Sequence, residues 1–580
     1  MADIIKVIGQ EIEDYNKPVE LSDGVSFSQP KLVKKISQCE AQVYPKGKKD
    51  SQGKYKYWFD IITPRVNAEV KNIDFDTKDA IVYSDHFGDK LAVLLSNFEL
   101  SNFLRDANKG EEFNNNIETF SSWGNVVWKK TKEGYEEVDL KNFYVLNQTA
   151  KTLDDSDVIE RHILTQADLR AKKGAWENVD AVIKDCGDRF FSSTRKSRDI
   201  DKSSPSYEIY ERNGEVSEAD LFKVKGMQGG DPDKFILAKI ISPVAGIEKD
   251  GEGKKYCLFA QEISEKPYKE AHRGRYKGRW FREGMYEILF DCQVRANEIG
   301  NQLARGLEWA SKTFFRTSDT LIIQNALTDL RNGAIIRAKE LSQVETRMQG
   351  FDQLIADWNR NIRHADELAN SYEVVTGESL PSGTPFRLGA MLNQNANKLF
   401  DFLREKLAIA LEDLFNEWII PKVMRKTRAK KVIELTGSGE ALKEYREMLV
   451  NAWYVGNLLS FPPHSSEQAV ALKAIKSQEL ARDKGAMAKI EEGFWEGFKP
   501  RARVIISGEN VNLARDLTTL ATFIQLEADP LRRSHLVELA LSKSGVNISD
   551  MPRSAPEQLT GRPAQVPQGQ APQEQPVLTT

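Results

Sequence analysis

Two long apolar stripes at helical spacing, separated by a short insert, constrain the fold of this chain more than any other feature. The first stripe lies between Glu283 and Arg316. It covers about 30 residues, which predicts a helix about 45 Å long. The second runs from Phe351 to Tyr372, and the insert between them has strand-like ends around an Asn332-Gly333 turn. Two helices joined in this way should pack as an antiparallel pair with the insert at the tip.

A loop rich in glycine, proline, serine and threonine follows, from Glu373 to Gln394, and a third apolar stripe then continues to Trp418. The loop lacks the features of a phosphate-binding loop. Five residues separate Gly377 from Gly383, no lysine occurs, and a helix precedes the loop where that motif needs a strand. We therefore predict a flexible connection between two helices. Pro421 is expected to end or kink the third helix.

The first 280 residues combine helical patterns with stretches of alternating polarity, and the latter predict β-strands. Turn sequences separate these strands at Glu133-Gly134, at Asn213-Gly214 and around Gly251 and Gly253. Each turn is predicted to close an antiparallel hairpin. Two further strands are expected at 430–437 and 501–507. The predicted fold class is therefore α+β, with meandering antiparallel strands in the first half of the chain.

The composition indicates a soluble protein of a reducing compartment. A net charge of −4, from 82 basic and 86 acidic residues, provides no general cationic field, so any contact with nucleic acid must be local. The four cysteines are far apart and indicate reduced thiols. The N-terminus has no signal-peptide pattern, and no apolar run approaches the roughly 20 residues of a membrane span, so we expect no membrane contact. The last 27 residues, rich in proline and glutamine, are predicted to be disordered.

No residue pattern supports catalysis, a cofactor or a metal ion. The six histidines show no metal-ligand spacing, and no nucleophile-elbow motif occurs. The acidic stretch from Asp74 to Asp79 falls short of a calcium-binding loop, so a solvated turn is the preferred interpretation. His364, within the second stripe, is expected to be solvated or to lie in an interface.

One segment, His272–Gly284, is dense in basic and aromatic residues. The mixture suits phosphate contact and base stacking. The segment also precedes the acidic start of the first long helix, at Glu283 and Glu287, so ion pairs between neighbouring elements or subunits are an equal alternative. A second basic run, Arg425–Lys431, is interpreted first as a solvated face. The cations of the first segment are Arg273, Arg275, Lys277, Arg279 and Arg282.

The order of these elements resembles that of tailed-bacteriophage portal proteins, which form a ring at one vertex of the capsid. The resemblance extends from about Lys56 to Pro552. Residues 122–170 are similar to a portal segment in which a hairpin leads to another strand and then to a helix that opens with Thr165. Residues 278–302 resemble the entry to the portal stem helix, with a glycine, an acidic residue and a Gln-x-x-x-Asn pattern at Gln293 and Asn297.

The resemblance implies a portal architecture: an α/β wing, a two-helix stem, a small α/β clip, a long kinked wing helix and a helical C-terminal crown. The corresponding residues are 1–282 for the N-terminal part of the wing, 283–316 and 349–372 for the stem helices, 317–348 for the clip, 373–390 for a tunnel loop, 391–510 for the rest of the wing, 511–553 for the crown and 554–580 for the disordered tail.

It also implies partners and places for them. Family members form dodecameric rings through which double-stranded DNA passes without regard to its sequence. The ring sits in the major capsid protein's shell, is assembled in the host cytoplasm and stays in the virion. Ser379, Ser382, Thr384 and Arg387 would face DNA in the channel. The packaging terminase, and later the head–tail adaptor proteins, would dock on the clip near Arg331, Asn332, Arg337, Lys339 and Glu345.

The charges of the two stem segments suit a channel that does not retain its cargo. Five acids and four bases lie between Glu283 and Arg316, and five acids and two bases lie between Gly350 and Glu373. Strong phosphate binding would stall moving DNA, so we expect a passive ring that hydrolyses nothing, with Arg387 touching phosphate. The alternatives are an enzyme or motor subunit acting on nucleic acid, for which the sequence shows no Walker motif, and a non-viral oligomeric channel or scaffold.

Overall fold

The computed structural model shows a mixed α/β protein, which agrees with the predicted α+β class at that level. Contacts divide the chain into two units, Met1–Ser507 and Gly508–Thr580, and every residue described below lies in the first. The structure describes residues 4–44, 47–49, 53–73, 75, 79–86, 89–106, 108–132, 134–186, 206–243, 257–310, 314–316, 342–344, 350–370, 386–430, 432–435, 439–457, 466–481, 486–490 and 494–504.

The first half contains the predicted antiparallel meander. Five strands pair in the order β10-β9-β8-β7-β6, each antiparallel to its neighbour. A second, three-stranded sheet has the order β11-β4-β5 and includes the predicted hairpin at Glu133-Gly134. The strands are β4 (Asn125–Thr131), β5 (Gly134–Glu137), β6 (Phe143–Val145), β7 (Val158–Thr165), β8 (Ser206–Ser217), β9 (Phe235–Pro243), β10 (Phe259–Glu262) and β11 (Tyr268–His272).

The hairpin predicted at Asn213-Gly214 is wrong, because both residues lie inside the single strand β8. Asn213 pairs with β7 on one side and with β9 on the other. Gly214 serves close approach here: a Cβ atom would lie 2.3 Å from Cγ of Asp157. The Asp157 carboxylate instead accepts the backbone N–H of Glu215 at 3.0 Å. The strands on both sides of Gly251 and Gly253 do pair, as β9 and β10, whereas residues 244–256 lie outside the described residues.

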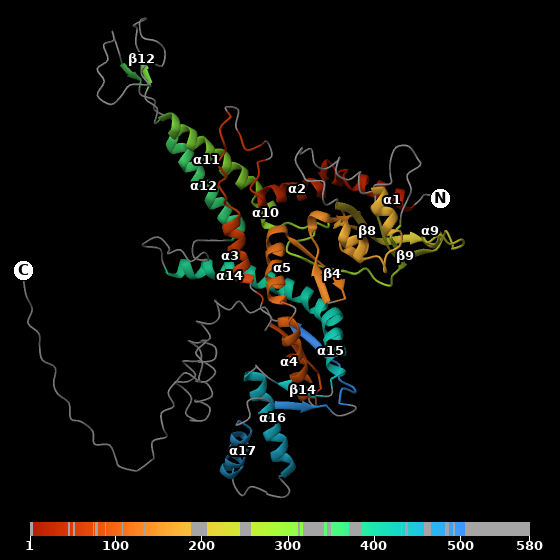
Figure 1. Ribbon diagram of the computed structural model, residues 1–580. Coiled ribbons are helices and arrows are strands. Elements are labelled where there is room, and N and C mark those ends of the chain that lie inside the picture. Colours follow the sequence, from red (N-terminus) through yellow and green to blue (C-terminus); the bar gives the residue numbers. More distant parts are fainter. Residues whose placement is uncertain are drawn as a thin grey trace, which may run out of the picture. The chain divides into compact units, whose positions relative to one another are not determined.

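The two predicted long helices are present as α10 (Met285–Ile288) with α11 (Phe290–Ala310), and as α12 (Phe351–Ala369). Leu289 separates the first two helices. Phe314, predicted to continue the helix, belongs instead to β12 (Phe314–Arg316), which pairs antiparallel with β13 (Ser342–Val344). The insert therefore has the predicted strand-like ends (Figure 1).

The third helix is kinked as predicted. Helix α14 (Phe386–Leu414) passes through a π-helical turn, Phe415–Ile419, into α15 (Ile420–Arg428), whose first turn contains Pro421. Proline fits there because the first turn of a helix needs no N–H from it, and the π turn absorbs the change of register. Residues 386–390, placed in the loop by the sequence, are helical.

Distant segments complete the body. The strand predicted at 501–507 is β16, paired with β3, and the strand predicted at 430–437 is β14, paired with β15. The largest apolar core joins α4 and α5 to α14 and α15. The remaining elements are α1 (Ile4–Tyr15), β1 (Val19–Ser22), β2 (Val25–Phe27), α2 (Gln29–Glu40), α3 (Thr63–Ile73), β3 (Ala80–Tyr83), α4 (Lys90–Asp106), α5 (Lys109–Trp123), α6 (Gln166–Ala171), α7 (Val179–Cys186), α9 (Glu218–Val224), β14 (Val432–Leu435), α16 (Gly439–Asn457), α17 (Ser466–Ala481), β15 (Ala486–Lys489) and β16 (Arg501–Val504).

Candidate functional site

Helices α11 and α12 form the antiparallel pair that the sequence predicts (Figure 1). The Asn361 side chain donates to the carbonyl of Cys292 at 3.0 Å, and Arg295 pairs with Asp357 at 2.6 Å. These contacts join later residues of one helix to earlier residues of the other, as antiparallel packing requires. At the base of the pair, Ala365 and Ala369 pack in one apolar cluster with residues of α10 and α11, among them Met285, Leu289, Cys292 and Ala296.

Three amide side chains, one turn apart on α11, hold the chain segment Tyr57–Ile61. Gln293 Oε1 accepts the N–H of Ile61 at 3.0 Å, Asn297 Oδ1 that of Phe59 at 2.8 Å, and Asn301 Oδ1 that of Tyr57 at 2.9 Å. Gln293 and Asn301 also donate to the carbonyls of Phe59 and Tyr57. We call this set the amide ladder.

The amide ladder fits because the spacing of its side chains along α11 nearly equals the spacing of alternate residues along the extended segment Tyr57–Ile61. Four helical residues advance about 6.0 Å, and two residues of an extended chain advance about 6.6 Å. Gly300 provides the space, since a Cβ atom there would lie 2.4 Å from the Phe59 ring. Phe59 in turn packs edge-on against Trp358 of α12. The sequence pattern had indicated Gln293 and Asn297, but it identified neither Asn301 nor the segment that all three bind.

Replacing Asn297 by alanine should destabilise the fold by about 1–3 kcal/mol, because the Phe59 N–H loses its partner in a part-buried place. Chemical denaturation of the purified chain measures this. Gln302→Ala is the control, since Gln302 is exposed on the same helix. Equal stability of the two variants would show that the amide ladder contributes nothing.

The basic segment His272–Gly284 uses most of its cations inside the subunit. Arg273 makes two bonds to Glu69, of 2.7 and 2.9 Å, and Glu69 is only 1% exposed. Lys277 pairs with Glu283, and Arg279 with Glu287. The structure thus favours the ion-pair alternative for these three residues.

The other two cations of the segment differ from each other. Arg282 is buried, which lowers its pKa; it donates to the carbonyls of Arg279 and Lys151 and lies over the Tyr276 ring. Arg275 is exposed and has no ion pair among the described residues. Trp280 and Phe281 are fully buried, so neither aromatic ring is available to stack on a base.

An ionic cluster joins the two sheets of the first half. Lys129 of β4 lies 2.6 Å from Glu160 of β7 and 2.9 Å from Glu211 of β8. Lys239 of β9 pairs with Glu211 at 2.7 Å, and the Tyr268 hydroxyl of β11 donates to Glu160 at 2.8 Å. Glu160 and Glu211 face each other in register on neighbouring strands. We call these residues, with His162, the inter-sheet cluster.

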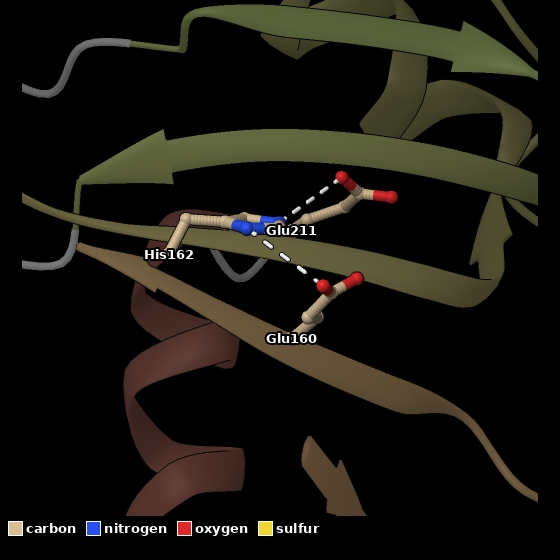
Figure 2. Close-up of side chains that lie close together, drawn as sticks. All are labelled: Glu160, His162 and Glu211. Atoms are coloured by element: carbon tan, nitrogen blue, oxygen red, sulfur yellow. Dashed lines mark ion pairs between the residues drawn. The ribbon is translucent and has the colours of Figure 1, made fainter. Parts of the chain in front are cut away.

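His162 lies between the two carboxylates of this cluster (Figure 2). Its Nε2 is 3.4 Å from Glu211, and its Nδ1 is 3.7 Å from Glu160. Glu160, His162 and Glu211 bring together atoms of the kind that bind metal ions, within 4.8 Å of one another. The linear spacing of the histidines did not reveal this grouping; the alternation Glu160-x-His162 on one strand was its only signal. Two lysines already neutralise both carboxylates, so a divalent ion would have to displace Lys129.

Burial alone would raise the pKa of Glu211, but the contact with His162 and the charges of Lys129 and Lys239 outweigh it and hold the pKa well below its ordinary value. The pKa of Lys129 is raised: burial opposes its charge, and the carboxylates of Glu211 and Glu160 overcome that effect. Glu211 and Lys129 therefore both keep their charges near neutral pH. The arrangement suits a structural role, in which ion pairs hold the two sheets together, better than it suits proton transfer.

Several predicted site residues fall outside this description. Arg387 lies in the first turn of α14. The remaining channel residues (Ser379, Ser382, Thr384) and all five clip residues (Arg331, Asn332, Arg337, Lys339, Glu345) lie outside the described residues, as do the predicted crown and tail. Cys39, Cys257 and Cys292 are free thiols.

Comparison with models of known protein families and with curated proteins found no match for this chain. Among the described residues, no helix is both long enough and apolar enough to cross a membrane.

Proposed function

We propose that this chain is the subunit of a portal ring, a passive channel for double-stranded DNA in a phage capsid. One observation carries the proposal: an antiparallel helix pair, α11 and α12, bears paired strands β12 and β13 at the connection between its helices, and a long kinked helix follows. This order is the one on which the portal resemblance rests.

Exposed apolar side chains support assembly with further copies. On the helix pair, Leu307 is 57% exposed and Ile355 is 40% exposed, and on α14 Ile409 is 56% exposed. Exposed apolar side chains that gather into one patch are typical of protein interfaces. In a closed ring each copy would cover such side chains on the next.

The charges of the helix pair suit a channel. Arg295 pairs with Asp357 and Glu298, and Arg360 pairs with Asp357, so two acids balance these two cations within the subunit. A surface of this kind binds phosphates weakly, which lets DNA slide. In this proposal a separate terminase moves the DNA, adaptor proteins later close the channel, and the ring is retained in the virion.

Negative-stain images of the purified chain, with light scattering to obtain the mass, test the proposal. A ring with a central hole, dodecameric or close to it, is expected, and the preparation should lack ATPase and nuclease activity. A compact monomer at all concentrations would overturn the portal assignment. ATP hydrolysis by the pure chain would favour the motor alternative.

Arg387→Ala should change the length of packaged DNA or its retention while leaving the ring intact, because the resemblance places this residue beside moving DNA. The measurement is the length of DNA in purified virions, with ring assembly checked by imaging. Lys31→Ala, a change at an exposed cation of α2, is the control. Normal DNA length and retention in the Arg387 variant would refute its role.

A further inference from the structure

Helix α15 carries a row of cations on one side and core residues on the other. Ile420, Val423, Met424 and Thr427 are buried. Lys422 and Lys426 lie one turn apart on the helix, about 6 Å along its axis, and Lys430 follows just beyond the end of the helix. Arg425 is exposed beside them. The apolar face is thus used within the subunit, and the cationic face is turned outward.

These lysines line a groove of about 570 Å³ between α4 and α15. Phe103 forms part of its wall, and the ammonium groups of Lys422 and Lys426 lie 5.4 and 5.7 Å from the centre of that ring. Such contacts hold flexible lysine side chains in place. The amide of Asn102 adds a polar side chain to the same wall.

The acids of the groove do not cancel its charge. Glu99 is paired with Lys430, both of its oxygens lying 2.7 Å from Nζ. Asp106 is the other acid of the lining. Arg425 and Lys426 have no carboxylate within ion-pair distance among the residues that the structure describes. Helix α15 therefore carries positive charge in a protein whose net charge is −4.

We propose that this surface, the α15 groove, binds the phosphate backbone of double-stranded DNA. Each DNA strand places one charge about every 3.4 Å along the axis, so cations about 6 Å apart can each meet a different phosphate. Contacts to the phosphates carry no sequence information, which fits binding without sequence preference. An anionic membrane is a poorer partner, because an interfacial helix needs a free apolar face and that of α15 is buried. The inference rests on the proposed DNA cargo and adds a contact outside the helix pair and its loop.

The test measures binding of fluorescein-labelled double-stranded DNA to the full chain by anisotropy across a salt series. The variant is Arg425→Gln with Lys426→Gln, two exposed residues outside the core. Losing two phosphate contacts should lower the slope of log affinity against log salt by about 2. The matched control is Lys31→Gln with Lys34→Gln on α2, which removes the same charge from another exposed face and should leave the slope unchanged.

An unchanged slope in the α15 variant overturns the proposal, and so does an equal loss in the α2 control. Ring assembly, checked by imaging for each preparation, separates this inference from the proposed function. If the chain forms a ring but its DNA affinity does not depend on Arg425 and Lys426, only the proposed role of the α15 groove is refuted. If the chain is a monomer and its DNA affinity does depend on these residues, the role of the groove is supported and the portal proposal is refuted.

Discussion

Replacing Lys129 by methionine is expected to destabilise the folded chain by about 3–5 kcal/mol, because breaking a buried ion pair leaves an uncompensated charge. The Lys129 side chain is 9% exposed, and its partners Glu160 and Glu211 are 11% and 5% exposed. Without Lys129, two carboxylates face each other across β7 and β8. Equilibrium denaturation in urea measures the change in the free energy of unfolding.

The neighbouring residue provides the control. Lys130 pairs with Glu265 at 3.1 Å, and both side chains are largely solvated, at 43% and 65% exposure. Lys130→Met should therefore cost less than about 1 kcal/mol. If both variants lose the same unfolding free energy, the inter-sheet cluster stabilises the fold no more than a surface ion pair does. Adding Glu211→Gln to Lys129→Met should recover part of the loss, since it removes one of the two opposed charges.

The loss of unfolding free energy caused by Lys129→Met should depend on pH. In the native protein the pKa of Glu211 lies well below its ordinary value of 4.5. Its contribution is therefore complete above about pH 4.5 and is lost as the pH falls through the folded value. In the variant, Lys129 no longer opposes the effect of burial, which raises the pKa of Glu211, so protonation at low pH relieves the repulsion. The difference between variant and native protein should shrink from pH 7 toward about pH 5.

Replacing Gly284 by alanine should cost about 3 kcal/mol or prevent folding, because the added atom meets backbone that cannot rotate away. A Cβ atom at Gly284 would lie 2.3 Å from the carbonyl oxygen of Ser122 and 2.4 Å from the nitrogen of Gly124. Gly124 ends α5 with φ +83, and Gly284 begins α10. The two glycines thus let the entry of the helix pair lie against the start of β4.

Thermal unfolding of Gly284→Ala, with circular dichroism as the signal, tests this expectation. Gly174→Ala is the matched control, since no atom lies within 4 Å of its Cβ position and its backbone is not left-handed. The control should change stability by less than about 0.5 kcal/mol. If the Gly284 variant has the same melting temperature as the native protein, the clash with the backbone is readily relieved and the expectation is wrong.

The sequence predicted local structure well where one face of an element is buried. Apolar periodicity placed the helix pair and the kinked helix, and alternation placed the strands. Glu133-Gly134 and Asn213-Gly214 show the limit: both dipeptides have turn chemistry, yet only near the first do two consecutive strands, β4 and β5, pair as a hairpin. The second lies in a central strand, where Asp157 of another element occupies the space that a side chain would need.

For the candidate sites, the sequence showed which residues are charged, but not which of them are paired in the folded protein. Composition alone marked His272–Gly284 as basic and aromatic, and phosphate contact was a reasonable hypothesis. Whether a cation is free depends on the acids that the fold brings to it, and Arg273 meets Glu69 from 204 residues away. Conversely, the sequence alone suggested an ordinary solvated face for the basic run Arg425–Lys431. The structure shows that Phe103 of α4 forms part of the wall of the α15 groove beside this run.

By itself, the sequence determined many of the helices and strands, because that choice depends largely on side-chain periodicity within ten or twenty residues. It also determined the absence of an overall cationic field, because net charge is a sum over residues. Only the tertiary structure decided that Gln293, Asn297 and Asn301 hold Tyr57–Ile61, and that Lys129 joins Glu160 to Glu211. Those contacts join residues far apart along the chain, and their energies depend on the burial and distances that packing alone sets.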